Sequence, residues 1–453
     1  MIRAILALAI LTTVPLCAAP DGMTAVTIRS DVTATDMTGR MATLTGSAKV
    51  TLTGQGDPIA NSAINFGSPD TWLILENVAP SKVTEGFLDR FFVDAVEARL
   101  EHNLRIEAYG QGTVVIPHGP DYTPLTVFSG RSMAGKSVSL RCYEKYKASD
   151  FGEVGPGIRS FRLKRGYMAT LAQNSNGTGI SRNYVAQDND VEVRSLPTGL
   201  DGSVNFIRIF PWRWTCKKGI AGGIWQDLEV SWFYDWNIGA ESSPDIEYVP
   251  IRQNRWWPGL NQNWRQKGSL HLLGYNEPDR PDQANMKPGD AIHSWPDLLA
   301  TGLRLGSPAV SDGGLGWLYD FMDRAEKAKL RVDFIAVHYY RAVGDPGDGR
   351  AAASQFQGFL KGIHDRTKRP IWITEWNNGA NWTKARDPEP KEQEKAIAEM
   401  IKMLDKTPYV ERYALYNWVE PSRELKRKDG SLTPAGIVYR DQKSPLAYKQ
   451  EKY

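Results

Sequence analysis

Two stretches of the sequence decide the fold: Gly274-Tyr275-Asn276-Glu277-Pro278 and Ile371-Trp372-Ile373-Thr374-Glu375-Trp376. In each of them an apolar run ends in a glutamate that lies among aromatic and small polar residues. A buried parallel strand that delivers a carboxylate to its C-terminal end has this pattern. Because apolar strands rarely end in an acid without a use for it, we interpret Glu277 and Glu375 as a functional pair rather than as two surface glutamates.

The composition is that of a globular chain with more than one domain. Its 453 residues exceed one ordinary domain, so two or three are expected. Hydrophobic residues make up 41% and charged residues 24%, which excludes a disordered chain. The net charge of +3 is too small to favour nucleic acid or an acidic membrane surface as a partner. The 15 Trp, 18 Tyr and 14 Phe residues suit the apolar faces of sugars, although most aromatic residues are core.

The first residues are typical of an export signal. Met1-Ile2-Arg3 is followed by the apolar run 4–16 and then by Cys17-Ala18-Ala19, which gives a basic start, a short hydrophobic stretch and small residues. The run is too short to cross a bilayer after export. We therefore expect residues 1–20 to be a signal peptide, and the mature protein to be a secreted or periplasmic monomer without membrane insertion.

Two cysteines, Cys142 and Cys216, remain after the predicted signal peptide. In an oxidising compartment a disulfide between them is one possibility, and two free buried thiols are the other.

Residues 21–120 have a β-rich pattern without visible chemistry. The segments 42–45 and 49–53 alternate with period two, glycines at 46, 54 and 56 punctuate them, and the segment 114–117 closes the region. We predict an accessory β-module here, built as a β-sandwich.

Residues 121–214 form a second β-rich region that repeats itself. The strand-like segment 126–128 leads to Gly135 and then to 158–163, and the segment 168–171 leads to Gly177 and then to 204–209. This duplication resembles the βγ-crystallin double Greek key. The calcium-binding acids of that family are not matched, because Gly155-Pro156 stands where a pair of Asn or Asp residues is needed. We expect a crystallin-like module that binds no calcium.

From residue 215 to residue 453 the pattern changes to strand, loop and helix. Eight apolar segments occur, at 219–221, 230–233, 248–251, 270–273, 303–306, 334–337, 370–373 and 413–416. Amphipathic helices are predicted at 317–329 and 392–404, and another begins near 432–436. Eight parallel strands in a region of this length predict a (β/α)8 barrel, with short or missing helices after the early strands. Glu277 and Glu375 then end strands four and seven, which face each other across the barrel mouth.

Paired carboxylates at a barrel mouth are the minimum machinery for cutting a glycosidic bond. Retaining glycosidases need the two groups ~5–5.5 Å apart and inverting enzymes need ~6.5–9.5 Å. The barrel accommodates either distance, so these residues alone do not choose between the two mechanisms.

Five motifs accompany this pair and cover most of residues 217–440. They are Lys218-Gly219-Ile220-Ala221, Leu273-Gly274-Tyr275-Asn276-Glu277-Pro278-Asp279 with Gln283-Ala284-Asn285-Met286, Ser307-Pro308-Ala309, Asp333-Phe334-Ile335-Ala336-Val337-His338-Tyr339-Tyr340 and Pro370-Ile371-Trp372-Ile373-Thr374-Glu375-Trp376. Together they resemble glycoside hydrolase family 128, whose members are endo-β-1,3-glucanases of clan A that retain anomeric configuration.

The resemblance implies Glu277 as general acid/base and Glu375 as nucleophile. An acid must then stay protonated near neutrality, while a nucleophile must be ionised and held by hydrogen bonds. Asn276 is expected to bond the sugar 2-hydroxyl, or else to cap a turn. His338 and Tyr340 end strand six beside strand seven, and we expect one of them to donate to Glu375; a satisfied core histidine is the alternative for His338.

Aromatic and basic residues near other strand ends are further candidates for substrate binding. We expect Trp376, and Trp418 after strand eight, to contact sugar, although core packing is the alternative for Trp418. Tyr234 and Trp236 lie at alternate positions of strand two and face either the mouth or the barrel interior. The basic and aromatic segment after strand three supplies Arg252 and Trp256.

These observations favour a secreted, retaining endo-glycoside hydrolase that cleaves a β-1,3-linked glucan of the laminarin type. The first alternative keeps the machinery and changes the polymer to a sulfated algal galactan, bound by Arg252, Arg265, Arg280 and Arg341. A solvated basic rim is the other interpretation of these arginines. The second alternative is a polysaccharide-binding protein with an inactive barrel. The 6 His residues are scattered, so we expect no metal and no cofactor.

Overall fold

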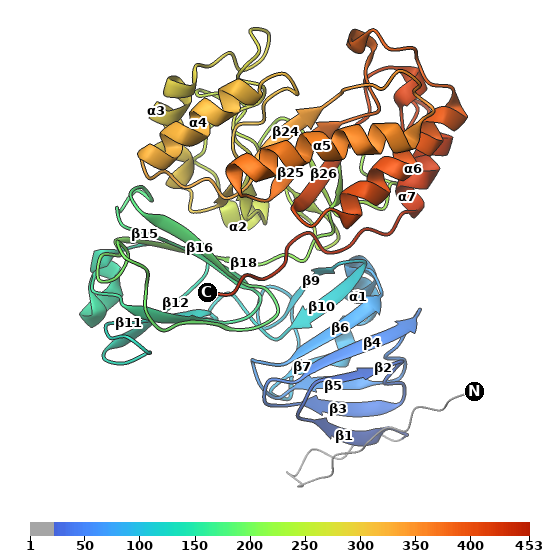
Figure 1. The fold of residues 1–453 in the computed structure, drawn as a ribbon. Coiled ribbons are helices and arrows are strands. Elements are labelled where there is room, and N and C mark those ends of the chain that lie inside the picture. Colours follow the sequence, from blue (N-terminus) through green and yellow to red (C-terminus); the bar gives the residue numbers. More distant parts are fainter. Residues whose placement is uncertain (1–21) are drawn as a thin grey trace. The chain divides into compact units, whose positions relative to one another are not determined.

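The computed structural model describes residues 22–453, and the predicted signal peptide lies outside this range. The chain divides into two compact units, Met1–Asp121 and Tyr122–Tyr453, coloured from blue to red along the sequence in Figure 1. Each unit has its own buried core of aliphatic and aromatic residues. The candidate glutamates both belong to the second unit.

In the first unit, the first seven strands alternate between two sheets. One sheet has the order β1 (Thr24–Ile28), β3 (Arg40–Leu44), β5 (Ala63–Phe66), β7 (Phe91–Val93), β8 (Val96–Glu97). The other has the order β2 (Val32–Ala34), β4 (Lys49–Gln55), β6 (Trp72–Asn77), β10 (Gly112–Ile116), β9 (Arg105–Tyr109). Helix α1 (Pro80–Gly86) and the turn η1 (Leu88–Arg90) precede β7.

The pairing in this unit is parallel from β1 through β7 in the first sheet and from β2 through β6 in the second. Only the last pairs of each sheet are antiparallel. The chain therefore winds as a short β-solenoid, and the predicted β-sandwich is wrong for this region. Period-two alternation identifies which side chains enter the core, such as Leu52 and Leu73, but it carries no information on strand direction.

The second unit begins with two antiparallel sheets of four strands each. The first has the order β12 (Ser137–Leu140), β11 (Leu125–Phe128), β14 (Ser160–Leu163), β17 (Val191–Val193). The second has the order β13 (Lys145–Lys147), β18 (Phe206–Pro211), β15 (Tyr167–Ala172), β16 (Ser181–Ala186), and the turn η2 (Ala148–Val154) follows β13. Strands β13 and β17 are exchanged, since each pairs in the sheet formed mainly by the other half of the repeat.

The rest of the second unit is built on eight parallel strands. Their bounds are β19 (Lys218–Ala221), β20 (Trp232–Tyr234), β21 (Glu247–Tyr248), β22 (His271–Leu272), β23 (Arg304–Leu305), β24 (Ile335–Tyr339), β25 (Ile371–Trp376), β26 (Val410–Tyr416). Six of them form a sheet in the order β21-β20-β19-β26-β25-β24, and β22 pairs with β23. Parallel bridges Ile251↔Leu273 and Gly306↔Phe334 join the two groups at both edges. The eight strands thus close into a ring, and each overlaps a segment predicted from the sequence.

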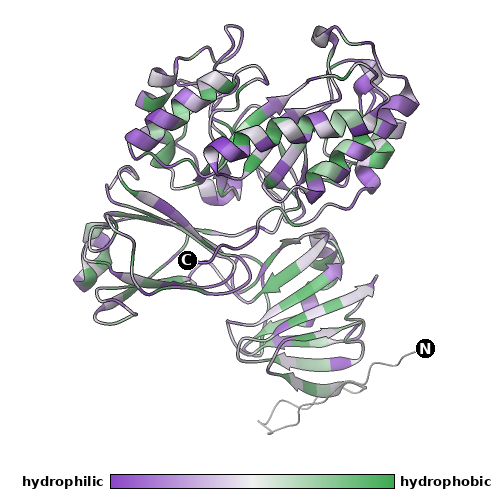
Figure 2. Cartoon of the chain, viewed as in Figure 1, coloured by the Kyte–Doolittle hydropathy of each residue, from purple (hydrophilic) through white to green (hydrophobic). Residues whose placement is uncertain are grey.

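Helices surround this ring unevenly. They are α2 (Trp264–Lys267), α3 (Pro288–Leu299), α4 (Leu315–Lys327), α5 (Gly349–Thr367), α6 (Pro390–Lys406) and α7 (Pro434–Asp441), with the turns η3 (Asn381–Thr383) and η4 (Pro421–Arg423). Loops alone follow the first two ring strands. In α4 the buried residues Leu318, Phe321, Met322 and Ala325 recur at helical spacing. Helix α5 lies across β24, β25 and β26 in Figure 1, and Figure 2 shows hydrophilic residues along α4 and α5 and hydrophobic residues on the strands.

The β-sheets of the second unit contact the ring where its strands begin. Thr170 Oγ1 donates to the carbonyl of Gly302, 2.6 Å away and just before β23. The tail returns to the same sheets, where the hydroxyl of Tyr453 accepts from the amide of Val185 at 2.9 Å. We call the N-terminal ends of the ring strands the base and the C-terminal ends the mouth. The sheets cover the base, and the two glutamates lie at the opposite end, the mouth.

Cys142 and Cys216 are both free thiols, so the disulfide left open by the sequence is absent. Among residues 22–453 no helix has the length and apolar character needed to cross a bilayer. Over the same range, no three His, Cys, Asp or Glu side chains are grouped so that they could hold a metal ion.

Candidate active site

Strand pairing continues up to the mouth of the ring and fixes the position of Glu277. Asn276 pairs in parallel with Ala309, and the amide of Glu277 donates to the carbonyl of Ala309 at 2.7 Å. The φ angle of Glu277 is +40°, a left-handed conformation that costs free energy for any residue with a Cβ. Asp279 secures this turn, since it accepts from both the amide and the hydroxyl of Ser311. A strained backbone held by its surroundings is typical of a functional residue.

Glu375 is held by three neutral donors, two from the end of β20 and one from the end of β24, the strand that neighbours its own. Its Oε1 accepts from Tyr234 Oη at 2.9 Å and from Trp236 Nε1 at 2.8 Å. Its Oε2 accepts from Tyr340 Oη at 2.6 Å. The Glu375 side chain is only 10% exposed. Both oxygens of this nearly buried carboxylate are therefore satisfied by hydrogen-bond donors.

The two tyrosines are suited to remain donors. Burial and then the charge of Glu375 raise the pKa of Tyr234 and the pKa of Tyr340 well above the ordinary value. Both hydroxyls therefore keep their protons over the whole physiological range. The ring of Tyr416 lies 6.1 Å from that of Tyr340, and burial followed by the charges of Glu375 and Glu277 raises the pKa of Tyr416 as well.

His338 lies between the two glutamates. Its Nδ1 is 2.9 Å from Oε1 of Glu277 and 3.5 Å from Oε2 of Glu375, and its side chain is fully buried. A single ring nitrogen is therefore within reach of both carboxylates. Sequence reasoning expected His338 or Tyr340 to serve Glu375; in the structure Tyr340 donates to Glu375 and the closer partner of His338 is Glu277.

The charges at the site decide where its proton lies. Burial opposes ionisation of Glu277, but the hydrogen bond and charge of His338, with a smaller contribution from Arg280, lower the pKa of Glu277. Burial likewise opposes the imidazolium, but the charges of Glu375 and Glu277 and the hydrogen bond to Glu277 raise the pKa of His338. The buried histidine therefore competes with Glu277 for the same proton, a feature that the sequence alone does not reveal.

Asn276 and Arg280 flank Glu277. Asn276 is 4% exposed, and its Nδ2 lies 3.3 Å from Gln283 Oε1. Its Oδ1 is buried without a hydrogen-bond partner among the described residues. The Nε of Arg280 lies 3.4 Å from Oε2 of Glu277, and the same guanidinium forms a forked pair with Asp282. Asn276 Oδ1 is thus available to a ligand at the mouth, whereas the guanidinium of Arg280 already pairs with Glu277 and Asp282.

Aromatic rings line the mouth next to Glu375. The ring of Trp418 lies 5.7 Å from Tyr416 and 6.2 Å from Trp236, and Trp418 is 45% exposed. The ring of Trp382, from η3, meets Tyr340 edge-on at 5.1 Å. Trp236 adopts a left-handed φ of +57°, which turns its indole towards Glu375. Trp418 therefore presents a flat face to solvent beside the candidate nucleophile.

Two predicted substrate contacts do not reach the mouth. Trp376 is fully buried and packs against Phe356 and Tyr439 of the surrounding helices. This prediction is wrong because side chains alternate along a strand: Glu375 faces the ring interior, so its neighbour faces the helices. Arg252 is 8% exposed, and its guanidinium donates to the carbonyls of Arg255 and Pro258. Arg252 holds its own loop and does not face a ligand, whereas Trp256 in that loop is 75% exposed.

Sequence reasoning missed Tyr416 and a second buried cluster. Tyr416 follows Ala414 by two positions, so period two alone identifies it as inward-facing. The second cluster occupies the base of the ring, where Arg304 pairs with Glu411 and Arg412 Nη2 lies 2.8 Å from Oε2 of Glu247. A register shift between Ile371 and Trp372 against β26 marks a bulge that lets both Glu411 and Arg412 reach partners.

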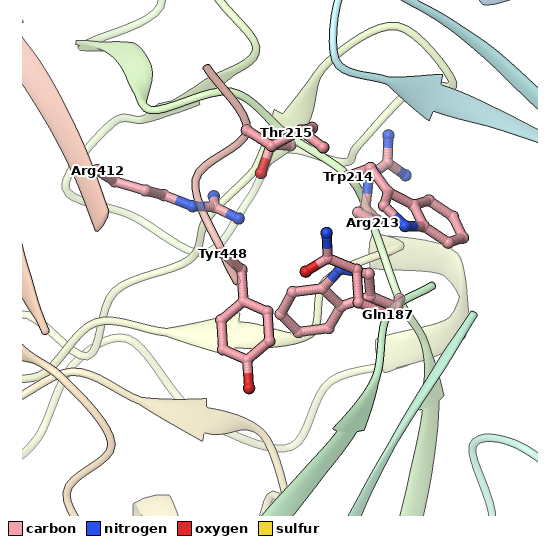
Figure 3. Close-up of a pocket in the computed structure, with 8 residues that line it drawn as sticks. Gln187, Arg213, Trp214, Thr215, Arg412 and Tyr448 are labelled. Carbon is pink, nitrogen blue, oxygen red and sulfur yellow. The ribbon is translucent and has the colours of Figure 1, made fainter. Parts of the chain in front are cut away.

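A small pocket also lies at the base. It is lined by Gln187, Trp212, Arg213, Trp214, Thr215, Arg412, Leu446 and Tyr448. Figure 3 shows Arg412 extending towards the space between Thr215 and Tyr448. No carboxylate lines this pocket, so it lacks the acid pair that distinguishes the mouth.

Comparison with known proteins assigns the region that carries the acid pair. The family model described as glycosyl hydrolase catalytic core matches residues 215–439. Alkali-sensitive linkage protein 1 of Schizosaccharomyces pombe is 28% identical over 228 residues, which are 46% of this chain and 40% of that protein. The chain therefore spans less than half the length of this curated relative.

Solved structures give a matching assignment. A GH128 subgroup I endo-beta-1,3-glucanase from Amycolatopsis mediterranei, in complex with laminaripentaose, is 33% identical and covers 50% of this chain and 99% of its own, with a TM-score of 0.45. A GH128 subgroup II endo-beta-1,3-glucanase from Sorangium cellulosum is 25% identical and covers 51% of this chain and 100% of its own, with a TM-score of 0.42.

Residues 215–439 are therefore the catalytic core of a glycosyl hydrolase. The solved structures to which this region is similar are described as GH128 proteins.

Proposed function

We propose that this protein is a retaining endo-glycoside hydrolase that cleaves a β-1,3-linked glucan, and that its ring of strands is a (β/α)8 barrel with the active site at the mouth. The observation that carries the proposal is the position of His338 Nδ1, within reach of Glu277 and Glu375 at once. A pair of carboxyl groups close to one another is what glycoside hydrolysis needs.

The distances are compatible with retention. The nearest oxygens of Glu277 and Glu375 are separated by no more than the sum of their distances to His338 Nδ1, 2.9 Å and 3.5 Å. This limit accommodates the ~5–5.5 Å between carboxyl groups that a retaining enzyme needs. We therefore propose direct attack by Glu375 on the sugar.

In the proposed first step, an oxygen of Glu375 attacks the anomeric carbon and the bond from that carbon to the glycosidic oxygen breaks. A proton passes from Glu277 to the departing oxygen, and an ester links the sugar to Glu375. In the second step Glu277 takes a proton from water, the water oxygen attacks the anomeric carbon, and the Glu375 carboxylate is released. Asn276 offers the open side of its amide to the 2-hydroxyl of the sugar.

His338 supplies the proton that Glu277 lacks in the free site. The pair His338–Glu277 holds one proton in a hydrogen bond of 2.9 Å, and this proton moves to Glu277 Oε1 as charge builds up on the departing oxygen. Formation of the ester removes the negative charge of Glu375. Because this charge favours the protonated form of His338, the proton is then bound less tightly. Glu277 is then free to act as the base of the second step.

A neutral glucan is favoured over a sulfated galactan. The related Amycolatopsis and Sorangium proteins are endo-beta-1,3-glucanases. Arg252 is committed to backbone carbonyls and Arg280 to Asp282 and Glu277. Arg341 donates to the carbonyl of Asp312 at 2.6 Å. Guanidinium groups already engaged in this way are poor candidates for sulfate.

Further proposals concern the rest of the chain. The basic start and apolar run of the N-terminal sequence support secretion or periplasmic location of the mature protein. The exchange of β13 and β17 between the two antiparallel sheets supports a crystallin-like double Greek key for residues 121–214.

The proposed function is tested by incubating the purified protein with laminarin, carrageenan and agarose and sizing the products over time. We expect laminarin alone to be shortened, with a mixture of intermediate oligosaccharides at early times, and nuclear magnetic resonance to show β-configured new reducing ends first. Cleavage of carrageenan or agarose instead of laminarin would show that the substrate is an algal galactan and not a β-1,3-glucan. Binding without cleavage by wild-type protein would favour the polysaccharide-binding alternative.

A further inference from the structure

The most exposed tryptophans of residues 22–453 all follow ring strands at the mouth. Their exposed fractions are 75% for Trp256, 45% for Trp257, 55% for Trp382 and 45% for Trp418. Adjacent large apolar side chains that are both exposed often mark an interaction site. Trp382 and Trp418 contact Tyr340 and Trp236, the donors to Glu375, so they belong to the site already described. Trp256 and Trp257 are not explained by that site.

The loop that carries Trp256 and Trp257 is held in shape by its own polar groups. Asn254 Oδ1 accepts from the amides of Trp256 and Trp257, each at 2.9 Å. The amide of Asn254 donates to the carbonyl of Trp257 at 3.0 Å. The buried guanidinium of Arg252 donates to the carbonyls of Arg255 and Pro258. Two indoles are thus presented to water on a loop that loses little conformational entropy when it meets a ligand.

This loop begins beside the candidate acid. The carbonyl of Gln253 accepts from the amide of Asn276 at 2.9 Å, and Asn276 immediately precedes Glu277. Trp382 and Trp418 lie by contrast next to the donors of Glu375. The tryptophan loop therefore extends the mouth on the Glu277 side, continuous with the site in which the bond is cut.

Chemistry restricts what these two rings can bind. The guanidinium of Arg255 covers Trp256 at 4.4 Å from the ring centroid, so one broad face of this indole remains. A flat apolar ring that is exposed to water can stack on the C–H face of a pyranose ring, and this contact requires no charged group. Each of the two tryptophans can therefore bind about one sugar unit.

We propose that Trp256 and Trp257 form an outlying binding site for pyranose units of the polysaccharide, on the Glu277 side of the mouth. The inference rests on the proposed function, because it takes the ligand to be the same glucan chain that is cut. It predicts that long chains gain affinity and rate from this loop and that short oligosaccharides do not reach it.

The test compares wild-type protein with Trp256→Ala, Trp257→Ala and the double variant, on β-1,3-linked gluco-oligosaccharides of increasing length. In the double variant we expect kcat/KM on the longest chains to fall about tenfold, which corresponds to about 1.4 kcal/mol, with the shortest cleaved oligosaccharide unaffected. Trp256→Phe keeps a flat ring and is the matched control, expected to retain most of the rate on long chains. Equal loss at every length, or no loss at any, overturns the proposal.

The same variants separate this inference from the function on which it rests. If wild-type protein cleaves no β-1,3-glucan, the proposed function fails, and affinity electrophoresis in laminarin gels still tests the loop. Retardation of wild-type protein that the double variant loses supports the binding site; equal migration of both contradicts it. Sedimentation of wild-type protein as a dimer and of the double variant as a monomer would also overturn the proposal, because the tryptophans would then join two copies of the chain.

Discussion

The base and the mouth of the strand ring hold two similar groups of side chains. The base group is Glu247, Glu411 and His271, accompanied by Arg304 and Arg412. The mouth group is Glu277, Glu375 and His338, accompanied by tyrosines and a tryptophan. Both groups contain two glutamates and one fully buried histidine. At the base each acid has a buried arginine, since Arg304 pairs with Glu411 and Arg412 with Glu247. At the mouth the arginine that pairs with Glu277 is Arg280, whose side chain is 45% exposed.

The difference in charge balance sets the state of each histidine. Burial, reinforced by Arg412 and Arg304, lowers the pKa of His271 to about 4 even though Glu247 opposes this shift, so His271 is neutral at physiological pH. At the mouth the charges of the two glutamates overcome burial and raise the pKa of His338. Balanced charges at the base can serve stability alone. The excess of acid at the mouth stores a proton and a reactive carboxylate, which are what glycoside hydrolysis needs.

The sharpest way to break this comparison is Glu375→Gln, which keeps the shape of the side chain and removes the nucleophile. We expect kcat/KM on laminarin to fall by a factor on the order of 10⁴ or more, because no ester can form. Thermal stability should change little, because the substitution keeps the shape of the side chain. Activity within about tenfold of wild type would exclude Glu375 as nucleophile.

The corresponding change at the base should act on folding. Glu411→Gln leaves Arg304 buried without its carboxylate, and we expect the free energy of unfolding to fall by about 3–5 kcal/mol in denaturant titrations. The folded fraction should cleave laminarin at nearly the wild-type rate. The matched control is Arg304→Met with Glu411→Leu, which removes both charges and should restore most of the stability. A stable Glu411→Gln variant would show that the base does not depend on charge balance.

The two histidines are compared by substituting each one and measuring the pH dependence of kcat/KM. The pKa of His338 is raised, so the His338–Glu277 pair holds its proton at lower pH and loses it as pH rises through the raised value; activity should fall on that limb. In His338→Gln we expect kcat to fall about a hundredfold and the basic limb to move to lower pH, because Glu277 alone must then keep the proton. His271→Gln is the control, and its profile should keep the wild-type limb. A His338→Gln limb that coincides with wild type would contradict the shared proton.

The smallest effect is expected for Arg280→Gln. Its guanidinium contributes to lowering the pKa of Glu277, so its removal should move the basic limb of kcat/KM slightly to higher pH. Solvent screens this partly exposed pair, and the shift should therefore shrink further in high salt. A shift to lower pH would show that Arg280 acts on another group.

Local patterns in the sequence predict the strands and the two catalytic candidates, but not the side chains that surround these acids. The apolar runs that end in Glu277 and Glu375 identify strand ends, since both the buried strand and the final carboxylate are visible within a few residues. Tyr340 is visible in the same way, two positions after His338. Trp376 lies next to Glu375 in sequence, which predicts a contact with sugar, but alternation along the strand turns its side chain to the opposite face.

What the sequence did not reveal depends on contacts between distant segments. Glu247 and Arg412 are 165 positions apart, and neither stands out in its own segment. The parallel winding of the first unit depends likewise on how strands such as β4 and β6 meet. Arg252 looked like a ligand for an anion because its segment is basic, but its guanidinium satisfies the carbonyls of its own loop. Hydrogen-bond demand inside a loop cannot be read from charge alone.

The central claim is most directly tested by trapping the covalent intermediate. In a β-configured 2-deoxy-2-fluoro glucosyl or laminaribiosyl donor, the fluorine slows both steps and a good leaving group restores the rate of the first, so the covalent intermediate accumulates. Mass spectrometry of the digested protein should then find one added sugar on the peptide that carries Glu375, and none in Glu375→Gln. A label on Glu277, or inverted product without any label, would contradict the account.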